Sequence, residues 1–238
     1  MRQGRAGALL DCRHDGIAAV MSTFETSPHV LRPQQQRSRA ALAKIVTAAE
    51  QLLRTKGVDG FSMAEVAEAS ALPVGNIYRR FRGKEELLQA IKYDVTARIE
   101  SAVDERLALR QFRDISDLIL RFAGATCDTF AGDETLYRAL FSVQTGSSAM
   151  DRIGASGRRR IFSRYREALL PFLEGVAKDK AELMVRVSFH IITAAILAKA
   201  RASDEALNDL SWTALGDEFG RAALAYLEAN LDSISKRG

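Results

Sequence analysis

Residues 71–84 concentrate side chains that form directed hydrogen bonds. The stretch ALPVGNIYRRF is followed closely by Lys84, so that an amide, a phenol, guanidinium groups and an ammonium group lie near one another in sequence. At helical spacing Leu72, Ile77 and Phe81 can face a core. The outward positions are then Val74, Asn76, Tyr78, Arg79 and Arg80. Amide and guanidinium groups pair with the edges of DNA bases, and phenol and ammonium groups bind phosphates, so this set predicts nucleic-acid chemistry.

Helices on both sides must present these side chains. A first helix is predicted from Ser38 to Lys56, because its apolar residues recur at helical spacing. Ser62 and Glu65 form a capping box that opens a second, short helix. A third helix is predicted over residues 72–81, with Pro73 in its first turn, and a long fourth helix begins at Lys84. Two short helices braced by longer ones predict a helix-turn-helix, whose second helix enters the major groove.

Residues 38 to about 90 resemble the DNA-binding domain of the TetR family of bacterial transcriptional regulators. The most specific part of the resemblance is the string Gly75-Asn76-Ile77-Tyr78-Arg79-Arg80-Phe81-Arg82-Gly83-Lys84-Glu85. The other positions that carry it are Ile45, Ala48, Ala49, Gly57, Phe61, Ser62, Val66, Ala67, Glu86, Leu87 and Leu88. Ala71 stands where the family often has glycine, and Pro73 where it often has a small hydroxyl residue. An alanine in this turn is strained if the turn requires a positive φ.

The candidate DNA-binding residues have different expected roles. Asn76 and either Arg79 or Arg80 are expected at base edges, and Val74 at a thymine methyl group. Gly75 allows close approach of the backbone, whereas Tyr78 and Lys84 are expected to hold phosphates. By family analogy Thr47 reaches a phosphate, although an ordinary surface threonine is an equal alternative. The complete predicted set is Thr47, Ser62, Pro73, Val74, Gly75, Asn76, Tyr78, Arg79, Arg80 and Lys84.

Beyond Lys84 the periodicity predicts a helical bundle. Further helices are expected near residues 114–131, 134–143, 161–171, 178–202 and 207–235, with a loop over residues 144–157. The predicted fold is therefore all-α, with about nine helices. Residues 1–33 are expected to be a disordered extension, residues 34–83 the helix-turn-helix domain and residues 84–238 an effector-binding and dimerisation domain. Arginines at 32, 37 and 39 are expected either to form a flexible DNA-contacting arm or to be unstructured charge.

The last two helices are predicted to form a homodimer interface, as the resemblance implies. Gly216 and Gly220 lie one turn apart inside a helix, where glycine costs about 1 kcal/mol relative to alanine unless another element approaches closely. A partner's helix is the expected neighbour, and burial within one chain is the alternative. The predicted interface comprises Ile191, Ala194, Ala195, Trp212, Gly216, Phe219, Gly220, Ala223 and Leu227.

An apolar pocket with a few polar groups is expected inside the bundle, since this is the usual composition of a small-molecule site. The resemblance implies that an effector bound there moves the long helices and weakens DNA binding. Core packing is the alternative for each residue, and His190 is expected to be buried in either case. The predicted lining is Phe122, Thr126, Phe130, Phe141, Phe162, Tyr165 and His190.

Composition and motifs exclude several classes of protein. Residues 1–90 hold 13 Lys and Arg against nine Asp and Glu, whereas the remainder holds 21 of each, so the excess of +4 lies at the expected DNA-binding end. Cys12 and Cys127 make no disulfide framework or metal spacing, which suits a cytoplasmic protein. The longest apolar stretch is shorter than the roughly 20 residues of a membrane span. No catalytic residue, cofactor or metal site is predicted, because no catalytic motif occurs. A helical scaffold or interaction protein without effector response is the alternative to a regulator.

Overall fold

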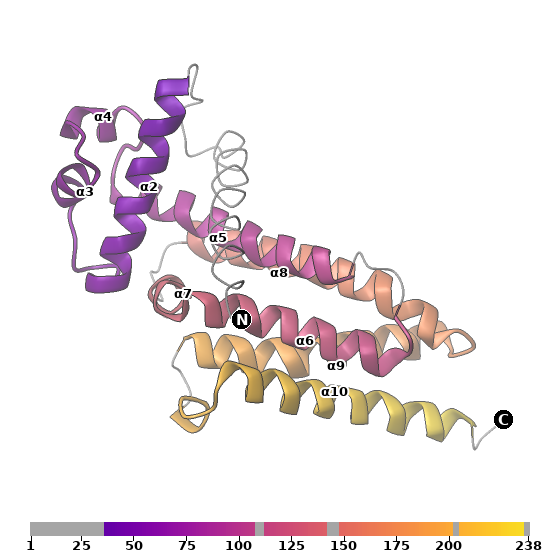
Figure 1. Ribbon diagram of the computed structural model, residues 1–238. Helices are drawn as coiled ribbons and strands as arrows, with labels where there is room; N and C mark the ends of the chain where they lie inside the picture. Colours follow the sequence, from indigo (N-terminus) through magenta and orange to yellow (C-terminus); the bar gives the residue numbers. More distant parts are fainter. Residues whose placement is uncertain (1–35, 108–111, 142–147, 202–204, 236–238) are drawn as a thin grey trace, which may run out of the picture. The chain divides into compact units, whose positions relative to one another are not determined.

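The computed structural model describes residues 36–107, 112–141, 148–201 and 205–235. These residues form nine α-helices, α2 to α10, and two short 3-10 helices (Figure 1). The predicted all-α class is confirmed, whereas the prediction for residues 1–33 lies outside the described residues. The chain divides into two compact units between Ala97 and Arg98, inside α5, whereas the predicted boundary lies at the start of that helix.

The N-terminal unit consists of three helices and the beginning of a fourth. Their bounds are Gln36–Lys56 (α2), Met63–Ser70 (α3), Val74–Tyr78 (α4) and Lys84–Leu107 (α5). The core takes the apolar stripe of α2 together with Val66, Ile77 and Phe81, all of them buried. The helix α4 is shorter than predicted, because Pro73 has an extended ψ of 138° and stands outside it.

The turn between α2 and α3 is fixed by the predicted capping box. The Oγ atom of Ser62 accepts a hydrogen bond from the Glu65 backbone N at 3.3 Å, and the Ser62 N donates to Glu65 Oε2 at 2.7 Å. Lys56 forms an ion pair with the same carboxylate. Hydrogen bonds from Lys56 and then Ser62 lower the pKa of Glu65 to about 2. The start of α3 therefore carries a carboxylate that stays ionised well below neutral pH.

The turn between α3 and α4 contains a left-handed alanine. Ala71 has φ 52° and ψ 42°, and its N–H donates to Glu68 O at 3.0 Å. The N–H of Leu72 donates to Ala67 O, also at 3.0 Å, which completes a Schellman-type end to α3. The strain expected for alanine at a positive φ is thus present, and amounts to about 1–2 kcal/mol.

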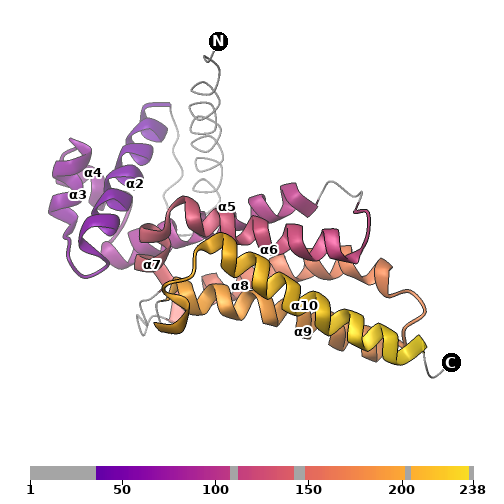
Figure 2. The same ribbon diagram turned by 60° about the horizontal axis from the view of Figure 1, so that its bottom comes forward.

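The C-terminal unit is a helical bundle. Besides the end of α5, it contains Ile115–Gly132 (α6), Glu134–Phe141 (α7), Ser148–Leu169 (α8), Leu170–Leu173 (η1), Lys178–Ala200 (α9), Glu205–Leu207 (η2) and Trp212–Ser235 (α10). The helix α10 packs along α6 and α9, and the three lie side by side in both views (Figures 1 and 2). Gly216 and Gly220 face α6 across this contact. A Cβ atom at Gly220 would lie 3.1 Å from Leu120 Cδ2 and 3.3 Å from Ala123 Cβ.

The helix α8 begins earlier than the sequence predicts. Residues 148–157 were predicted to lie in a loop because of their glycines, but they form the first turns of α8. Met150 and Gly157 are both buried, so tertiary packing of this segment overrides the weak helix propensity of glycine.

The apolar helix α9 is the only one of the described helices that is long and apolar enough to cross a membrane. Its inner side, which includes Met184, Phe189 and Ile192, is buried among the other helices of the bundle. Packing inside the bundle therefore explains why α9 is so apolar, as expected of a buried helix.

Candidate nucleic-acid interface

The helix α4 presents one apolar and one outward face, as its spacing predicts. Ile77 is buried in the core, whereas 47% of Val74 and 52% of Tyr78 is exposed. Gly75 is also exposed, and a Cβ atom there would meet nothing within 4 Å. The outward face of α4 is therefore open to a macromolecular partner over its whole length.

Asn76 and Arg79 form a polar pair on this face. A terminal nitrogen of Arg79 donates to Asn76 Oδ1, three residues earlier in the chain. Arg79 is exposed, and Asn76 is half-buried beside it. This contact orients the guanidinium group and leaves its remaining N–H groups, and those of the Asn76 amide, to donate to other acceptors. Such an arrangement suits hydrogen bonding to base edges.

Arg80 takes a different position from its neighbour. Its Nη2 donates to Ser38 O at 2.9 Å and to Ser38 Oγ at 2.7 Å. Burial, and then the charge of Arg79, lower the pKa of Arg80 from its usual value. Through these hydrogen bonds Arg80 links the turn after α4 to the first turn of α2. Of the two arginines considered for base contacts, Arg79 is the one left outward, and the Ser38 contact is a role that sequence reasoning missed.

Lys84 and Ser62 are both engaged at the turn before α3. The Lys84 ammonium donates to Phe61 O and lies 4.3 Å from the centre of the Phe61 ring. The Ser62 hydroxyl and backbone N–H are both used by the capping box. These residues thus hold the domain together, and a phosphate contact by either would be additional to that role. Thr47 is exposed on α2, and Pro73 is exposed before α4.

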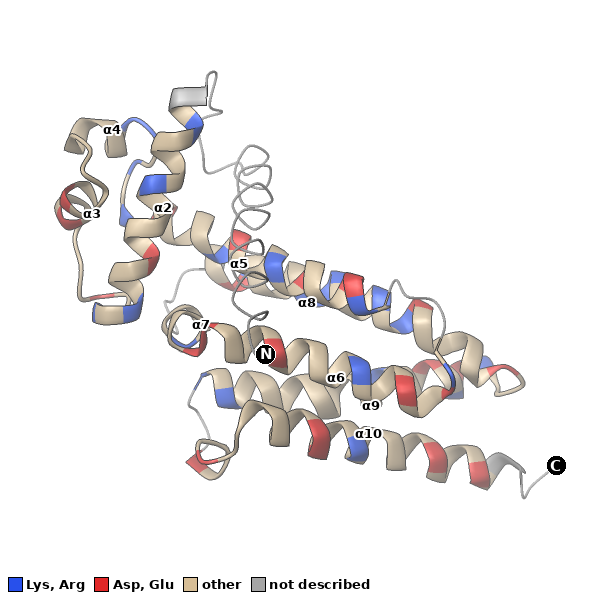
Figure 3. Ribbon diagram, viewed as in Figure 1, with Lys and Arg blue, Asp and Glu red and all other residues tan. Residues whose placement is uncertain are grey.

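Basic residues gather near the outward face of α4. Figure 3 shows Lys and Arg on α2 and on the turn that follows α4, whereas α3 carries acidic residues. The basic positions of the turn are Arg79, Arg80 and Arg82, and Lys84 begins α5. A polyanion approaching α4 would therefore meet positive charge from α2 and from the turn that follows α4.

The predicted pocket residues form two packed aromatic clusters. Phe122 lies 4.6 Å from Tyr165 and 5.8 Å from Phe189, measured between ring centres. Phe162 joins this cluster through Phe189 at 5.1 Å. The hydroxyl of Tyr165 donates to Ser188 Oγ at 2.8 Å. These rings therefore pack against one another inside the bundle.

The second cluster lies around Phe130. Its ring contacts Phe141, Tyr137 and Trp212, with centres 5.7, 4.7 and 5.3 Å apart. The hydroxyl of Thr126 donates to Phe122 O, so it is satisfied within α6. His190 is exposed on α9, and the prediction that it is buried is wrong. Its spacing from Val187 and Ala194 places it on the outer side of α9, a distinction that periodicity alone did not make.

Most of the residues predicted at the dimer interface are instead buried by contacts within one chain. Trp212, Gly216, Gly220, Ala223, Leu227 and Ala195 are buried. Trp212 Nε1 donates to Glu134 Oε2 at 3.0 Å, and the two glycines face α6. The prediction that a partner's helix approaches these glycines is therefore wrong, because α6 of the same chain occupies that position. Ile191, Ala194 and Phe219 remain at least partly exposed.

Comparisons with known proteins bear on the N-terminal unit and on the fold. Residues 45–91 match the model for bacterial regulatory proteins of the tetR family. No curated protein matches the chain. A solved structure from Mesorhizobium loti MAFF303099, assigned to the TetR family of transcriptional regulators, has a TM-score of 0.68 at 17% identity, over 82% of this chain and 98% of that one.

Two solved regulators named FadR have a similar fold, and the first is described as a fatty acid degradation regulator. FadR from Bacillus halodurans has a TM-score of 0.64 at 15% identity, over 81% of this chain and 97% of that one. FadR from Bacillus subtilis, solved with stearoyl-CoA, has a TM-score of 0.60 at 14% identity, over 76% and 97%. The resemblance drawn from residues 38 to about 90 is thereby confirmed: the protein carries an N-terminal domain of the tetR family of bacterial regulatory proteins within a fold shared by solved TetR-family regulators.

Proposed function

We propose that the protein is a cytoplasmic, ligand-responsive transcriptional regulator that binds a pseudo-palindromic operator as a homodimer and acts as a repressor. The outward face of α4 carries this proposal. It combines exposed Val74 and Tyr78 with the Asn76–Arg79 pair, on a helix that its buried Ile77 fixes to a three-helix domain. This is the side-chain chemistry that reads bases in a major groove.

Each outward residue has a proposed role on DNA. Asn76 and Arg79 read base edges, and Val74 contacts a thymine methyl group. Tyr78 binds a phosphate, and Thr47 and Lys84 add phosphate contacts beside it. Gly75 lets the backbone of α4 approach the groove, since it has no side chain on the open face. Arg80 positions α4 through Ser38 and does not contact bases.

The homodimer is proposed to form through the outer faces of α9 and α10. On α9 the exposed or half-buried positions Leu183, Val187, His190 and Ala194 recur at helical spacing, and Leu183 is 50% exposed. Phe219 and Tyr226 are half-buried on α10. An apolar stripe of this kind suits a two-fold interface. The dimer places two copies of α4 in successive major grooves, about 34–36 Å apart or a multiple of that distance.

Leu183→Glu tests this interface. A carboxylate within an apolar contact is expected to dissociate the dimer, because it would lose its hydration on association. Light scattering on the full chain should then report the monomer mass, with circular dichroism unchanged. Glu228→Gln, at an exposed position of α10, is the matched control. A dimer that survives Leu183→Glu contradicts the proposed surface.

Effector response is proposed to act through α5. This helix is continuous from Lys84, which contacts Phe61, to its last turns, where Glu100 accepts two hydrogen bonds from Arg160. A small apolar or aromatic effector that rearranges the aromatic clusters of the bundle would shift these last turns. The similar fold of FadR from Bacillus subtilis, solved with stearoyl-CoA, supports a regulator that responds to a ligand. A coupling free energy of about 1–3 kcal/mol is enough for regulation.

Selection of bound sequences from a random DNA pool tests the proposal. A recovered pseudo-palindrome is expected, with half-sites about one helical turn, or a multiple of it, apart. The affinity for that sequence should fall with salt, at a log-log slope of about −0.9 per phosphate contacted. If the protein retains no DNA at low salt, the proposed regulatory function is wrong and a helical scaffold protein is favoured.

A further inference from the structure

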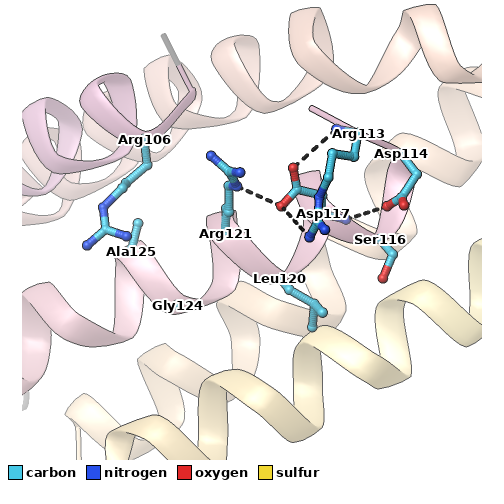
Figure 4. A pocket seen from close by; sticks show the side chains of 9 residues that line it. All are labelled: Arg106, Arg113, Asp114, Ser116, Asp117, Leu120, Arg121, Gly124 and Ala125. Carbon is cyan, nitrogen blue, oxygen red and sulfur yellow. Dashed lines mark hydrogen bonds and ion pairs between the residues drawn. The ribbon is translucent and has the colours of Figure 1, made fainter. Parts of the chain in front are cut away.

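A surface pocket of about 390 Å³ lies between the last turn of α5 and the first half of α6 (Figure 4). Three guanidinium groups line the pocket. Arg106 lies on α5, Arg113 lies just before α6, and Arg121 lies on α6. Two carboxylates, Asp114 and Asp117, line it as well. The pocket belongs entirely to the C-terminal unit, and its residues are not among those of the aromatic clusters.

Both carboxylates are committed to partners within the chain. Asp117 Oδ1 accepts a hydrogen bond from Arg121 Nε at 2.7 Å, and Asp117 Oδ2 accepts one from the Arg113 backbone N at 3.2 Å. The Arg121 contact is the main cause that lowers the pKa of Asp117. Asp114 caps α6 by accepting from the Asp117 backbone N at 2.8 Å. Asp117 thus holds Arg121 through Nε, and the other nitrogens of that guanidinium remain to bind a ligand.

The other two arginines are held loosely. Arg106 lies 3.7 Å from Asp128 and is 55% exposed, and Arg113 lies 3.7 Å from Asp117 and is 82% exposed. The Arg106–Asp128 pair is exposed on both sides, and an exposed pair at this distance contributes little to stability, so Arg106 can exchange that carboxylate for another anion at little cost. Figure 4 shows Arg106 reaching from α5 toward Ala125 of α6, while Arg121 extends from α6 into the space beside it.

Gly124 supplies an independent observation. Glycine inside a helix costs stability relative to alanine, so it is expected where something approaches the backbone closely. Gly216 and Gly220 meet this expectation, since their missing side chains make room for α6. A Cβ atom at Gly124 would meet nothing within 4 Å in the described chain. The space beside Gly124 belongs to the pocket.

We propose that this pocket binds the carboxylate or phosphate group of a small molecule. Arg121 provides a fixed guanidinium donor, and Arg106 and Arg113 turn to the anion from either side. Gly124 lets the ligand lie against α6. Because Arg106 belongs to α5, an occupied site ties the end of α5 to α6. Regulation by this tie rests on the proposed function, whereas anion binding does not.

Isothermal titration calorimetry on the full chain, without DNA, tests the site. Inorganic phosphate, phenyl phosphate and benzoate are titrated at constant ionic strength in chloride, with benzylamine as the matched cation. One saturable site per chain is expected for at least one of the anions, and none for benzylamine. Tighter binding of phenyl phosphate than of benzoate identifies a phosphate ligand, and the reverse order a carboxylate. Inorganic phosphate binding as tightly as phenyl phosphate identifies a free anion.

Two variants locate the binding. Arg121→Leu removes the donor, and Gly124→Leu fills the space without changing charge. Each is expected to weaken binding at least tenfold, whereas Arg159→Ala, at an exposed position of α8, should leave it unchanged. Gly124→Leu remains informative if Arg121→Leu, which leaves Asp117 without its partner, fails to fold. Absence of saturable binding by all three anions, or undiminished binding by Gly124→Leu, overturns the proposal. Failure to bind operator DNA does not affect either result.

Discussion

The helices α4 and α10 achieve their positions by opposite means. With five residues, α4 buries only Ile77 and leaves its other side chains outward, so that neighbouring elements hold it in place. With 24 residues, α10 buries Trp212, Leu215, Ala223 and Leu227, and its glycines let α6 approach closely. The N-terminal unit therefore acts through what it exposes, whereas the bundle is determined by what it encloses. A substitution should accordingly affect binding on α4 and folding on α10.

The largest expected effect lies in the bundle. Gly220→Leu places a side chain against Leu120 and Ala123, and overpacking of this kind should lower the free energy of unfolding by about 3 kcal/mol. Gly124→Ala, on the open side of α6, should instead raise it by up to about 1 kcal/mol, because alanine is the better helix former. Urea unfolding of both variants measures the difference. If the Gly220→Leu variant keeps its stability but no longer dimerises, the original prediction that a partner's helix lies beside Gly220 would be supported instead.

The second-largest expected effect is on base recognition by α4. Asn76→Ala or Arg79→Ala is expected to relax the preference at one base step by about 1–3 kcal/mol, while the free energy of unfolding stays nearly unchanged. Tyr78→Phe should weaken binding to all sequences alike, because a phosphate contact carries no sequence information. Since Arg79 donates to Asn76, the double variant should lose less than the sum of the two.

Affinities for the selected operator and for each single-base variant, at one salt concentration, measure these effects. A uniform loss of affinity from both Asn76→Ala and Arg79→Ala, without any change in base preference, would contradict their assignment as base readers.

Arg80 tests whether neighbouring arginines have separate roles. Arg80→Ala removes two hydrogen bonds to Ser38 and should lower the free energy of unfolding by about 1–2 kcal/mol, a value reduced for partial exposure. Operator affinity should fall without a change in base preference, because α4 loses its attachment to α2. Arg82→Ala, at an exposed position nearby, is the control for charge. An Arg80→Ala protein of full stability with altered base preference would identify Arg80 as a base reader.

The N-terminal unit was predictable because its signals are local. Ser62 and Glu65 are three residues apart, and the inward positions Ile77 and Phe81 follow from helical spacing, whereas the question of strain at Ala71 came from the family resemblance. The Arg80–Ser38 contact was missed because 42 residues separate its partners.

In the bundle, the apolar patterns predicted which helices form but not which neighbour each face meets. Gly216 and Gly220 indicated a close approach correctly, yet their sequence does not distinguish α6 from a second copy. The same limit explains His190, whose helix has apolar residues on more than one side. The early start of α8 depends on burial of Met150, which no local signal reveals.

The smallest expected effect concerns the turn that aims α4. Ala71 has a positive φ, so Ala71→Gly removes about 1–2 kcal/mol of strain. Part of this gain is offset, because glycine makes the unfolded chain more flexible by about 0.4–1 kcal/mol. A net stabilisation of about 0.5–1 kcal/mol is therefore expected in urea unfolding. Ala69→Gly, an exposed position within α3, should instead destabilise the domain. If Ala71→Gly also destabilises it, the turn is not strained, and the orientation of α4 must depend mainly on its packing and on the Arg80 contact.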